Sequence, residues 1–220
     1  MERKKVYFVS GIDTDAGKSF ATGYIARKWR EEGANVITQK LVQTGSDGIS
    51  EDIATHRRIM GTGLLREDHA YTTCPLRFRY PASPDLAARL ENRRVDLGEA
   101  DTATMTLLRD YDTVLVEGAG GLMVPIEGFY TMLDYAADRG LPVILVTNPR
   151  LGSVNHTLLS LEACRNRGVG VDFLAYNLYP ETSPEITGDT RLFFRTYLRE
   201  RMPECGFIEV PFMPEFRAAE

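Results

Sequence analysis

The stretch of sequence that decides the fold is Ser10-Gly11-Ile12-Asp13-Thr14-Asp15-Ala16-Gly17-Lys18-Ser19. It follows an apolar segment at 6–9, which predicts a strand, and precedes a segment at about 18–32, which predicts a helix with apolar residues near one face. A glycine-rich turn in that context is typical of a P-loop. The strict pattern would place a glycine at position 12, where Ile12 stands, so the sequence predicts a P-loop with modified spacing.

The residue types in this turn indicate a phosphate cradle. Gly17 has no Cβ, so backbone N–H groups can approach phosphate oxygens, and the positive end of the following helix adds to their attraction for an anion. Lys18 can reach the β- and γ-phosphates of a nucleotide, and the Ser19 hydroxyl can ligate Mg²⁺. No Asn-Lys-x-Asp segment for reading guanine is present, which favours ATP. The alternative is a chance strand–turn–helix junction with a surface lysine.

Strands and helices alternate along the rest of the chain, which predicts a parallel sheet covered on both faces. Further strands are expected at 36–38, 113–116, 143–146, 171–176 and 207–210. Further helices are expected at 51–60, 85–92, 99–110, 132–138, 154–166 and 191–201. Residues 62–84 contain several glycine and proline breaks and are expected to be irregular. We therefore expect an α/β, single-domain P-loop fold over residues 1–220, with a mostly parallel sheet and helices on both faces.

The composition sets limits on partners and compartment. With 43% apolar and 26% charged residues in 220, it is that of an ordinary globular protein, and a net charge of −5 argues against a broad nucleic-acid-binding face. Cys74, Cys164 and Cys205 are odd in number and far apart, so reduced thiols are expected rather than disulfides or a zinc site. The charged start, 1–5, is unlike a signal peptide, and no apolar run approaches the roughly 20 residues that span a bilayer. A cytoplasmic protein is expected, without membrane association.

Residues 9–19 resemble the lengthened P-loop of the dethiobiotin synthetase family, usually Thr-Gly-x-Asp-Thr-x-x-Gly-Lys-Thr. Further segments that resemble the family's motifs follow in the same order. They are Gln39-Lys40-Leu41-Val42-Gln43-Thr44-Gly45, Ser50-Glu51-Asp52, Ser83-Pro84, Val116-Glu117-Gly118-Ala119-Gly120-Gly121, Leu151-Gly152-Ser153-Val154-Asn155-His156 and Asn177. Together they cover roughly residues 6 to 180, and the combination is far more specific than any one of them.

The chain departs from the family pattern at a few positions. Leu41 replaces a proline, Asp85 stands where a histidine follows Ser-Pro, and Asp15 replaces a glutamate. Beyond Asn177 the match is loose and runs through Val210-Pro211-Phe212.

The resemblance implies an ATP- and Mg²⁺-dependent ring closure. CO₂ would add to one amine of 7,8-diaminononanoate as a carbamate, and the γ-phosphoryl group would activate that carbamate as a mixed anhydride. The second amine would then close the ureido ring of dethiobiotin, a step of biotin biosynthesis. The family works as a homodimer, with the substrate carboxylate held partly by the partner subunit.

Ser19, Asp52 and Glu117 form the expected Mg²⁺ set, one hydroxyl and two carboxylates with water and phosphate oxygens completing an octahedron. Glu117 is expected at the end of a buried strand, where open α/β sheets place their ligand crevice. The alternatives are a strand-end carboxylate that caps a helix for Glu117 and an exposed first-turn residue for Asp52.

The resemblance also distributes roles among the other residues. Lys18 and Lys40 are the expected catalytic cations, although a lysine in the position of Lys40 is more often at the surface. The expected nucleotide-binding positions are Thr14, Asp15, Ala16, Gly17, Lys18, Ser19, Phe20, Asp52, Glu117, Gly118, Ala119, Gly120, Asn177 and Pro211. The expected substrate-binding positions are Lys40, Thr44, Gly120, Gly152 and Asn155. For Asn177 the alternative is a turn-forming asparagine.

Two other classes compete with this interpretation. A cobyrinate-diamide-synthase-like ligase would carry a glutaminase domain, for which 220 residues leave no room. A regulatory ATPase of the partitioning type normally has a second lysine inside the P-loop, where this chain has Ile12-Asp13-Thr14. His56, His69 and His156 are scattered, and none is expected to be catalytic or to form a metal cluster.

Overall fold

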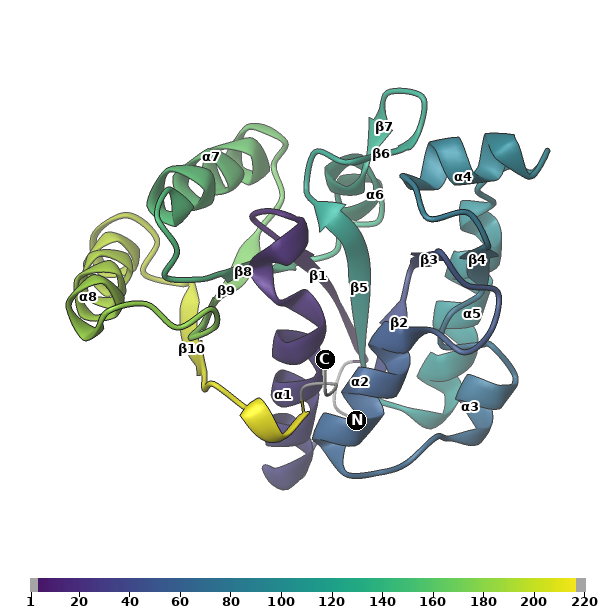
Figure 1. Ribbon diagram of the computed structural model, residues 1–220, viewed down its shortest axis with the longest axis horizontal. Helices are drawn as coiled ribbons and strands as arrows, with labels where there is room; N and C mark the ends of the chain where they lie inside the picture. The colour runs from purple at the N-terminus through teal and green to yellow at the C-terminus, as the bar shows by residue number, and fades with distance from the viewer. Residues whose placement is uncertain (1–3, 217–220) are drawn as a thin grey trace.

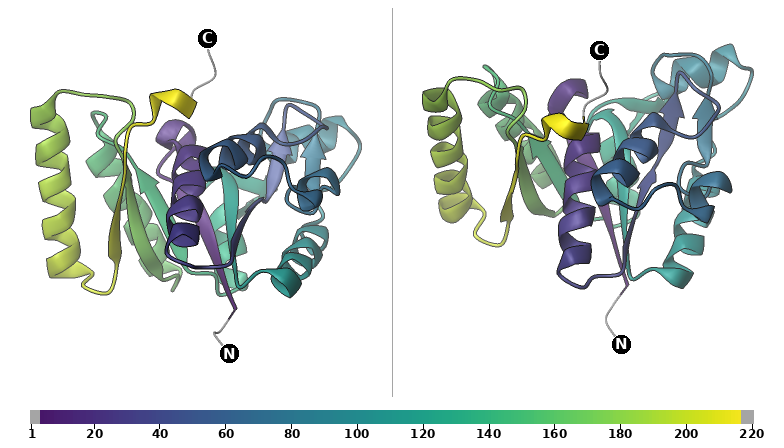
Figure 2. Two further views of the ribbon diagram at one scale, coloured as in Figure 1. Left: turned by 90° about the horizontal axis from the view of Figure 1, so that it is seen from below. Right: turned by 60° about the horizontal axis from the view of Figure 1, so that its bottom comes forward.

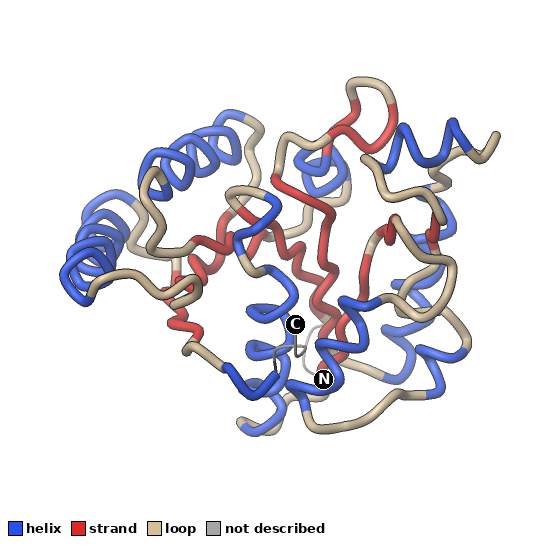
Figure 3. The backbone as a smooth tube through the Cα atoms, in the orientation of Figure 1, coloured by secondary structure: helices blue, strands red, loops and turns tan. Residues whose placement is uncertain are grey.

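A six-stranded parallel sheet in the order β10-β9-β8-β1-β5-β2 forms the centre of the molecule (Figures 1 and 3). The computed structural model describes residues 4–216. The strands of this sheet are β1 Lys5–Gly11, β2 Val36–Lys40, β5 Thr113–Gly121, β8 Val143–Thr147, β9 Val171–Asn177 and β10 Gly206–Val210. Every pairing between them is parallel, so their carboxyl ends meet at one edge. The predicted α/β fold with a mostly parallel sheet is confirmed.

Helices cover both faces of this sheet (Figure 2). The helices of the described chain are α1 Lys18–Glu31, α2 Glu51–Met60, α3 Arg66–His69, α4 Pro84–Leu90, α5 Leu97–Asp110, α6 Met132–Asp138, α7 Ser153–Asn166 and α8 Pro184–Arg201, with short 3₁₀ turns η1 Thr14–Ala16 and η2 Pro214–Phe216. Tyr7 and Val9 of β1 join a core with α1 and α2, and Phe8 joins a larger core with α5 to α8. Successive side chains of one strand thus build two apolar layers.

Two short strand pairs lie outside the main sheet. β3 Val42–Thr44 pairs in parallel with β4 Leu76–Phe78, and β6 Pro125–Glu127 forms an antiparallel hairpin with β7 Tyr130–Thr131. The expectation that residues 62–84 are irregular is wrong where α3 and β4 stand. β4 forms because it pairs with β3 and buries Leu76 and Phe78, a tertiary contact that local sequence does not reveal.

Two element bounds differ from the prediction. α8 begins at Pro184 rather than near residue 191, because the Ser183 side chain accepts a hydrogen bond from Ile186 N and proline is favourable in the first helical turn. β5 runs on to Gly121, so Glu117 lies within this strand and not at its end. Gly118 makes this continuation possible, since a Cβ there would lie 2.7 Å from the Phe8 ring.

Each of the three cysteines is buried and unpaired. Burial raises the pKa of the Cys74 and Cys164 thiols to about 12 and that of Cys205 to about 11. In the part of the chain that the structure describes, no helix has both the length and the apolar character to cross a membrane.

Candidate nucleotide and metal site

The turn between β1 and α1 folds into a tight loop at the carboxyl edge of the sheet. Asp13 begins it, and its Oδ1 accepts a hydrogen bond of 2.7 Å from Thr14 N. Gly17 then adopts φ 80° and ψ 36°, in the left-handed region that favours glycine. A Cβ at Gly17 would lie 2.0 Å from Nδ2 of Asn177, which donates to Ala16 O at 3.2 Å. Asn177, the last residue of β9, therefore supports the loop through its hydrogen bond to Ala16.

Lys18 is folded back onto this loop. Its Nζ donates to Asp13 O at 3.2 Å and to Thr14 O at 3.1 Å, and the residue is only 5% exposed. Burial lowers the pKa of Lys18, and the nearby carboxylate of Glu117 opposes this shift. The ammonium is thus held at the mouth of the loop by neutral oxygens, where a phosphate would be a stronger partner.

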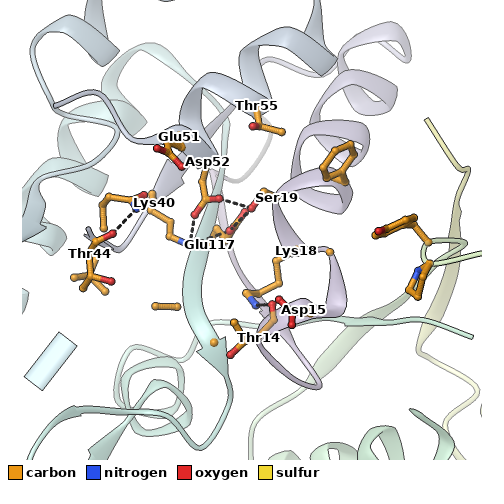
Figure 4. A pocket seen from close by; sticks show the side chains of 18 of the residues that line it. Thr14, Asp15, Lys18, Ser19, Lys40, Thr44, Glu51, Asp52, Thr55 and Glu117 are labelled. Atoms are coloured by element: carbon orange, nitrogen blue, oxygen red, sulfur yellow. Dashed lines mark hydrogen bonds and ion pairs between the residues drawn. The ribbon is translucent and has the colours of Figure 1, made fainter. Parts of the chain in front are cut away.

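Four side chains from α1, α2, β2 and β5 form a continuous network beside the loop, which we call the cavity network: Ser19, Lys40, Asp52 and Glu117 (Figure 4). Ser19 Oγ lies 2.6 Å from Asp52 Oδ1 and 3.0 Å from Glu117 Oε1. Lys40 Nζ lies 2.6 Å from Asp52 Oδ2 and 3.0 Å from Glu117 Oε1. Lys40 also donates to Gly118 O at 3.0 Å. Segments 98 residues apart in sequence thereby meet at one point.

Within the cavity network, the charges of Lys40 and Glu117 keep each other ionised. Burial alone would raise the pKa of Glu117, but the Lys40 ammonium and the hydrogen bond from His56 hold it far below its ordinary value. Burial alone would lower the pKa of Lys40, but the charges of Glu117 and Asp52 raise it well above the ordinary value. Glu117 is therefore a carboxylate and Lys40 an ammonium throughout the physiological range.

His56 completes this arrangement, and the sequence analysis gave it no role. It is fully buried on α2, with Nε2 2.8 Å from Glu117 Oε2 and Nδ1 3.0 Å from Thr38 Oγ1. The signal available in the sequence was its position four residues after Asp52, which puts both side chains on one face of a helix. No such signal pointed to Arg57, which donates to Thr38 Oγ1 at 2.8 Å.

A cavity of about 680 Å³ lies in front of the loop and the cavity network. Its lining includes these expected site residues: Thr14, Asp15, Gly17, Lys18, Ser19, Phe20, Lys40, Thr44, Asp52, Glu117, Ala119 and Gly120. It also includes residues that the sequence analysis did not single out for a role: Val42, Gln43, Glu51, Thr55, Arg150, Tyr179 and Pro180. Arg150 pairs with Asp13 of the loop, a contact across 137 residues of sequence that no local pattern indicates.

The remaining expected site residues lie outside the cavity lining. Ala16 is buried within the loop, Gly118 is reached through its carbonyl oxygen, and Asn177 is buried below. Pro211 lines a separate groove with Tyr24 and Phe212. Gly152 and Asn155 are exposed at the start of α7. The structure thus brings the loop, Lys40 and the carboxylates together, and it leaves these six residues apart from that cavity.

The donor set at Ser19, Asp52 and Glu117 has the chemistry of a Mg²⁺ site. Mg²⁺ takes one or two carboxylates and fills its octahedron with water and phosphate oxygens. Within residues 4–216 no group of three or more His, Cys, Asp or Glu side chains is arranged to hold a metal alone. Ser19 Oγ lies between the two carboxylates, 2.6 Å from Asp52 Oδ1 and 3.0 Å from Glu117 Oε1.

Comparison with known sequences identifies the family. Residues 5–200 match a family model described as an AAA domain. The ATP-dependent dethiobiotin synthetase BioD 2 of Pasteurella multocida is 51% identical, over 92% of this chain and 95% of its own length. The chain belongs to the dethiobiotin synthetase family. Within this family, BioD 2 of Haemophilus ducreyi is 46% identical over 93% of this chain and 97% of its own, and BioD of Chlorobaculum tepidum is 47% identical over 94% and 85%.

Solved structures agree with this assignment at the level of the fold. A plasmid partition protein of Borrelia burgdorferi, bound to AMPPNP, covers 100% of this chain and 92% of its own with a TM-score of 0.53 at 14% identity. At that identity the likeness extends to the P-loop fold alone.

Proposed function

We propose that this chain is an ATP-dependent ligase that closes the ureido ring of dethiobiotin from 7,8-diaminononanoate and CO₂. The observation that carries the proposal is the near full-length match to relatives named ATP-dependent dethiobiotin synthetase. The cavity supports it, because one end carries a phosphate loop and the other carries Lys40 and Thr44.

The reaction needs three steps. An amine nitrogen attacks CO₂ and loses a proton, which gives a carbamate. A carbamate oxygen then attacks the γ-phosphorus, the bond to the β-phosphate oxygen breaks, and ADP leaves. The second amine attacks the carbonyl carbon and loses a proton, and phosphate leaves as the ring closes. This chemistry depends on positioning and charge stabilisation rather than on a nucleophile from the protein.

The protein's residues supply those two needs. Lys18 would leave the carbonyl oxygens of Asp13 and Thr14 for the β- and γ-phosphates. Lys40, held between Asp52 and Glu117, would offset the charge of the carbamate and of the phosphoryl group in transfer. Thr44 would hydrogen-bond the polar end of the diamine.

Ser19, Asp52 and Glu117 would hold Mg²⁺. When bound, this cation neutralises charge on the β- and γ-phosphate oxygens. The protein's part is to present Ser19 Oγ with one oxygen of each carboxylate beside it, at 2.6 Å for Asp52 Oδ1 and 3.0 Å for Glu117 Oε1.

A homodimer belongs to the same proposal. Phe129, at the tip of the β6–β7 hairpin, and Leu151, just before α7, are almost completely exposed, and an interface that covered them would remove their apolar surface from water. Gly152 and Asn155 lie next to Leu151 and would contact substrate across this interface. Sedimentation tests it: Leu151→Ser should shift the protein toward monomer, and a fully active monomer of the unaltered chain would contradict it.

Phosphate release from Mg·ATP and bicarbonate, with and without 7,8-diaminononanoate, tests the activity. We expect release only with the diamine, and a product whose mass shows one carbonyl bridging the two amines. Hydrolysis that ignores the diamine and yields no new product would instead favour a regulatory ATPase.

A further inference from the structure

The two oxygens of Glu117 have different surroundings. Oε1 lies 3.0 Å from both Ser19 Oγ and Lys40 Nζ, on the side of the cavity. Oε2 lies 2.8 Å from His56 Nε2, and neither His56 nor Thr38 behind it lines the cavity. One oxygen is therefore available to a ligand in the cavity, and the other is held from within the protein.

The partner of His56 Nε2 decides which atom donates. Glu117 Oε2 lies 2.8 Å from Nε2, and an ionised carboxylate only accepts hydrogen bonds, so Nε2 carries the N–H. On the other side of the ring, Nδ1 lies 3.0 Å from Thr38 Oγ1, which also accepts a hydrogen bond from Arg57 Nη1 at 2.8 Å. A series of hydrogen bonds thus runs from Arg57 through Thr38 and His56 to Glu117.

A buried carboxylate holds the Arg57 end of this series of hydrogen bonds. Asp68 receives Arg57 Nε and Nη2 at 2.9 Å each and also accepts from Thr73 Oγ1 at 2.7 Å. His56 lies one helical turn after Asp52, so α2 presents a candidate metal ligand and the support for Glu117 on the same face.

From this geometry we infer that His56 is a positioning residue: its Nε2–H holds Glu117 Oε2, which turns Oε1 toward the Mg²⁺ position beside Ser19. The inference rests on the metal site of the proposed function. Groups that orient metal ligands in this way commonly change metal affinity by about 10- to 100-fold when they are removed.

Binding of Mn²⁺ in the presence of AMP-PNP tests the inference without turnover, with free Mn²⁺ followed by electron paramagnetic resonance. His56→Leu removes the donor and should raise the Mn²⁺ dissociation constant about 10- to 100-fold. His56→Gln keeps an N–H donor at a similar reach and should restore most of the affinity. Affinity for the nucleotide in EDTA should stay unchanged in both variants, and His69→Leu, at an exposed histidine, is the matched control.

The outcomes separate this inference from the metal site itself. Glu117→Gln serves as the benchmark and should weaken Mn²⁺ binding at least as much as His56→Leu. If Glu117→Gln weakens binding and His56→Leu does not, the positioning role is overturned and the metal site stands. Equal losses in His56→Leu and His56→Gln, with parallel losses in melting temperature, would also overturn it and leave His56 a packing residue. Unchanged binding in Glu117→Gln would overturn the metal site and this inference together.

Discussion

Two buried ionic networks lie on either side of Thr38, and they differ in how completely their charges are satisfied. The cavity network has two carboxylates, Asp52 and Glu117, and one ammonium, Lys40, and it lines an open cavity. The other, which we call the sealed network, consists of Arg57, Asp68 and Thr73. There one carboxylate meets one guanidinium, both are at most 2% exposed, and none of the three residues lines the cavity.

This difference indicates that the sealed network serves the structure and that the cavity network serves binding. Asp68 accepts two hydrogen bonds from Arg57, one from Thr73 and one from Leu65 N at 2.7 Å, so its oxygens are saturated. The cavity network carries one negative charge more than positive among its four side chains. An excess of carboxylate beside a cavity suits a further cation, and a saturated pair suits rigidity.

The largest effect is expected at Lys18, which stands beside both the loop and the cavity network. Lys18→Ala removes the cation that the β- and γ-phosphates would meet, so turnover should fall by about 10³-fold or more. Initial rates of diamine-dependent phosphate release measure this loss. Lys28→Ala, at an exposed lysine of the same helix, is the control and should keep the full rate. A rate near normal for Lys18→Ala would show that the phosphate site lies elsewhere.

The sealed network should matter chiefly for stability. Arg57→Met leaves Asp68 buried without its partner, which typically costs about 3–5 kcal/mol of unfolding free energy. Urea denaturation measures it, with Arg27→Met as the control. Arg27 pairs with Glu31 at the surface, so its loss should cost about 1 kcal/mol or less. Equal losses for the two variants would mean that the sealed network contributes no more stability than a surface ion pair.

The pH dependence of that cost follows from Asp68. Burial alone would raise the pKa of Asp68, but the hydrogen bonds and charge of Arg57 hold it below its ordinary value of about 3.9. A lowered pKa in the folded state contributes stability above the unfolded pKa, and this contribution is lost as pH falls through the folded pKa. Asp68 titrates alike in the two unfolded states, so the difference in unfolding free energy between the unaltered chain and Arg57→Met depends on the two folded states. It should shrink as pH falls from the raised pKa that buried Asp68 has without Arg57 toward its lowered pKa in the unaltered chain. A constant difference from pH 7 to pH 3 would contradict the assignment.

The fold and the cavity side of this comparison were accessible from the sequence. The strand–glycine–lysine–serine context predicted the loop, and alternating elements predicted the parallel sheet, because both depend on local patterns. Glu117 was expected near the loop because open α/β sheets place their ligand crevice at the strand ends, whereas Lys40 was expected there only through the family resemblance. The structure brings the two to 3.0 Å.

What the sequence did not reveal depends on contacts between distant segments. The pairing of Arg57 with Asp68 and the pairing of Arg150 with Asp13 are settled by how helices and loops dock on the sheet. His56 was passed over because a lone histidine in a helix has no pattern of its own; its meaning comes from Asp52 one turn earlier and from Glu117 in another strand.

A substitution of Lys40 tests whether the cavity network has an excess of negative charge. Lys40→Met leaves Asp52 and Glu117 facing each other without an ammonium, and because Asp52 is partly exposed we expect a loss of about 3 kcal/mol in EDTA. A cation bound at these carboxylates replaces the missing charge, so Mg²⁺ should raise the melting temperature of this variant more than that of the unaltered chain. Thermal unfolding with Mg²⁺ and with EDTA measures this difference. An identical Mg²⁺ response in both proteins would mean that the excess charge does not attract a cation.

The smallest effect is expected at Thr73, where one hydrogen bond can be removed from the sealed network with little change in shape. Thr73→Val deletes the 2.7 Å bond to Asp68 Oδ1, but this oxygen still accepts from Arg57 Nη2. A hydrogen bond to a charged group contributes about 1.5–3 kcal/mol, and the remaining bond puts the expected loss at the lower end. Urea denaturation should detect this loss while kcat and KM stay unchanged, since Thr73 does not line the cavity. A fall in kcat without a fall in stability would show that the two networks act as one, and that Thr38 transmits changes in the sealed network to Glu117.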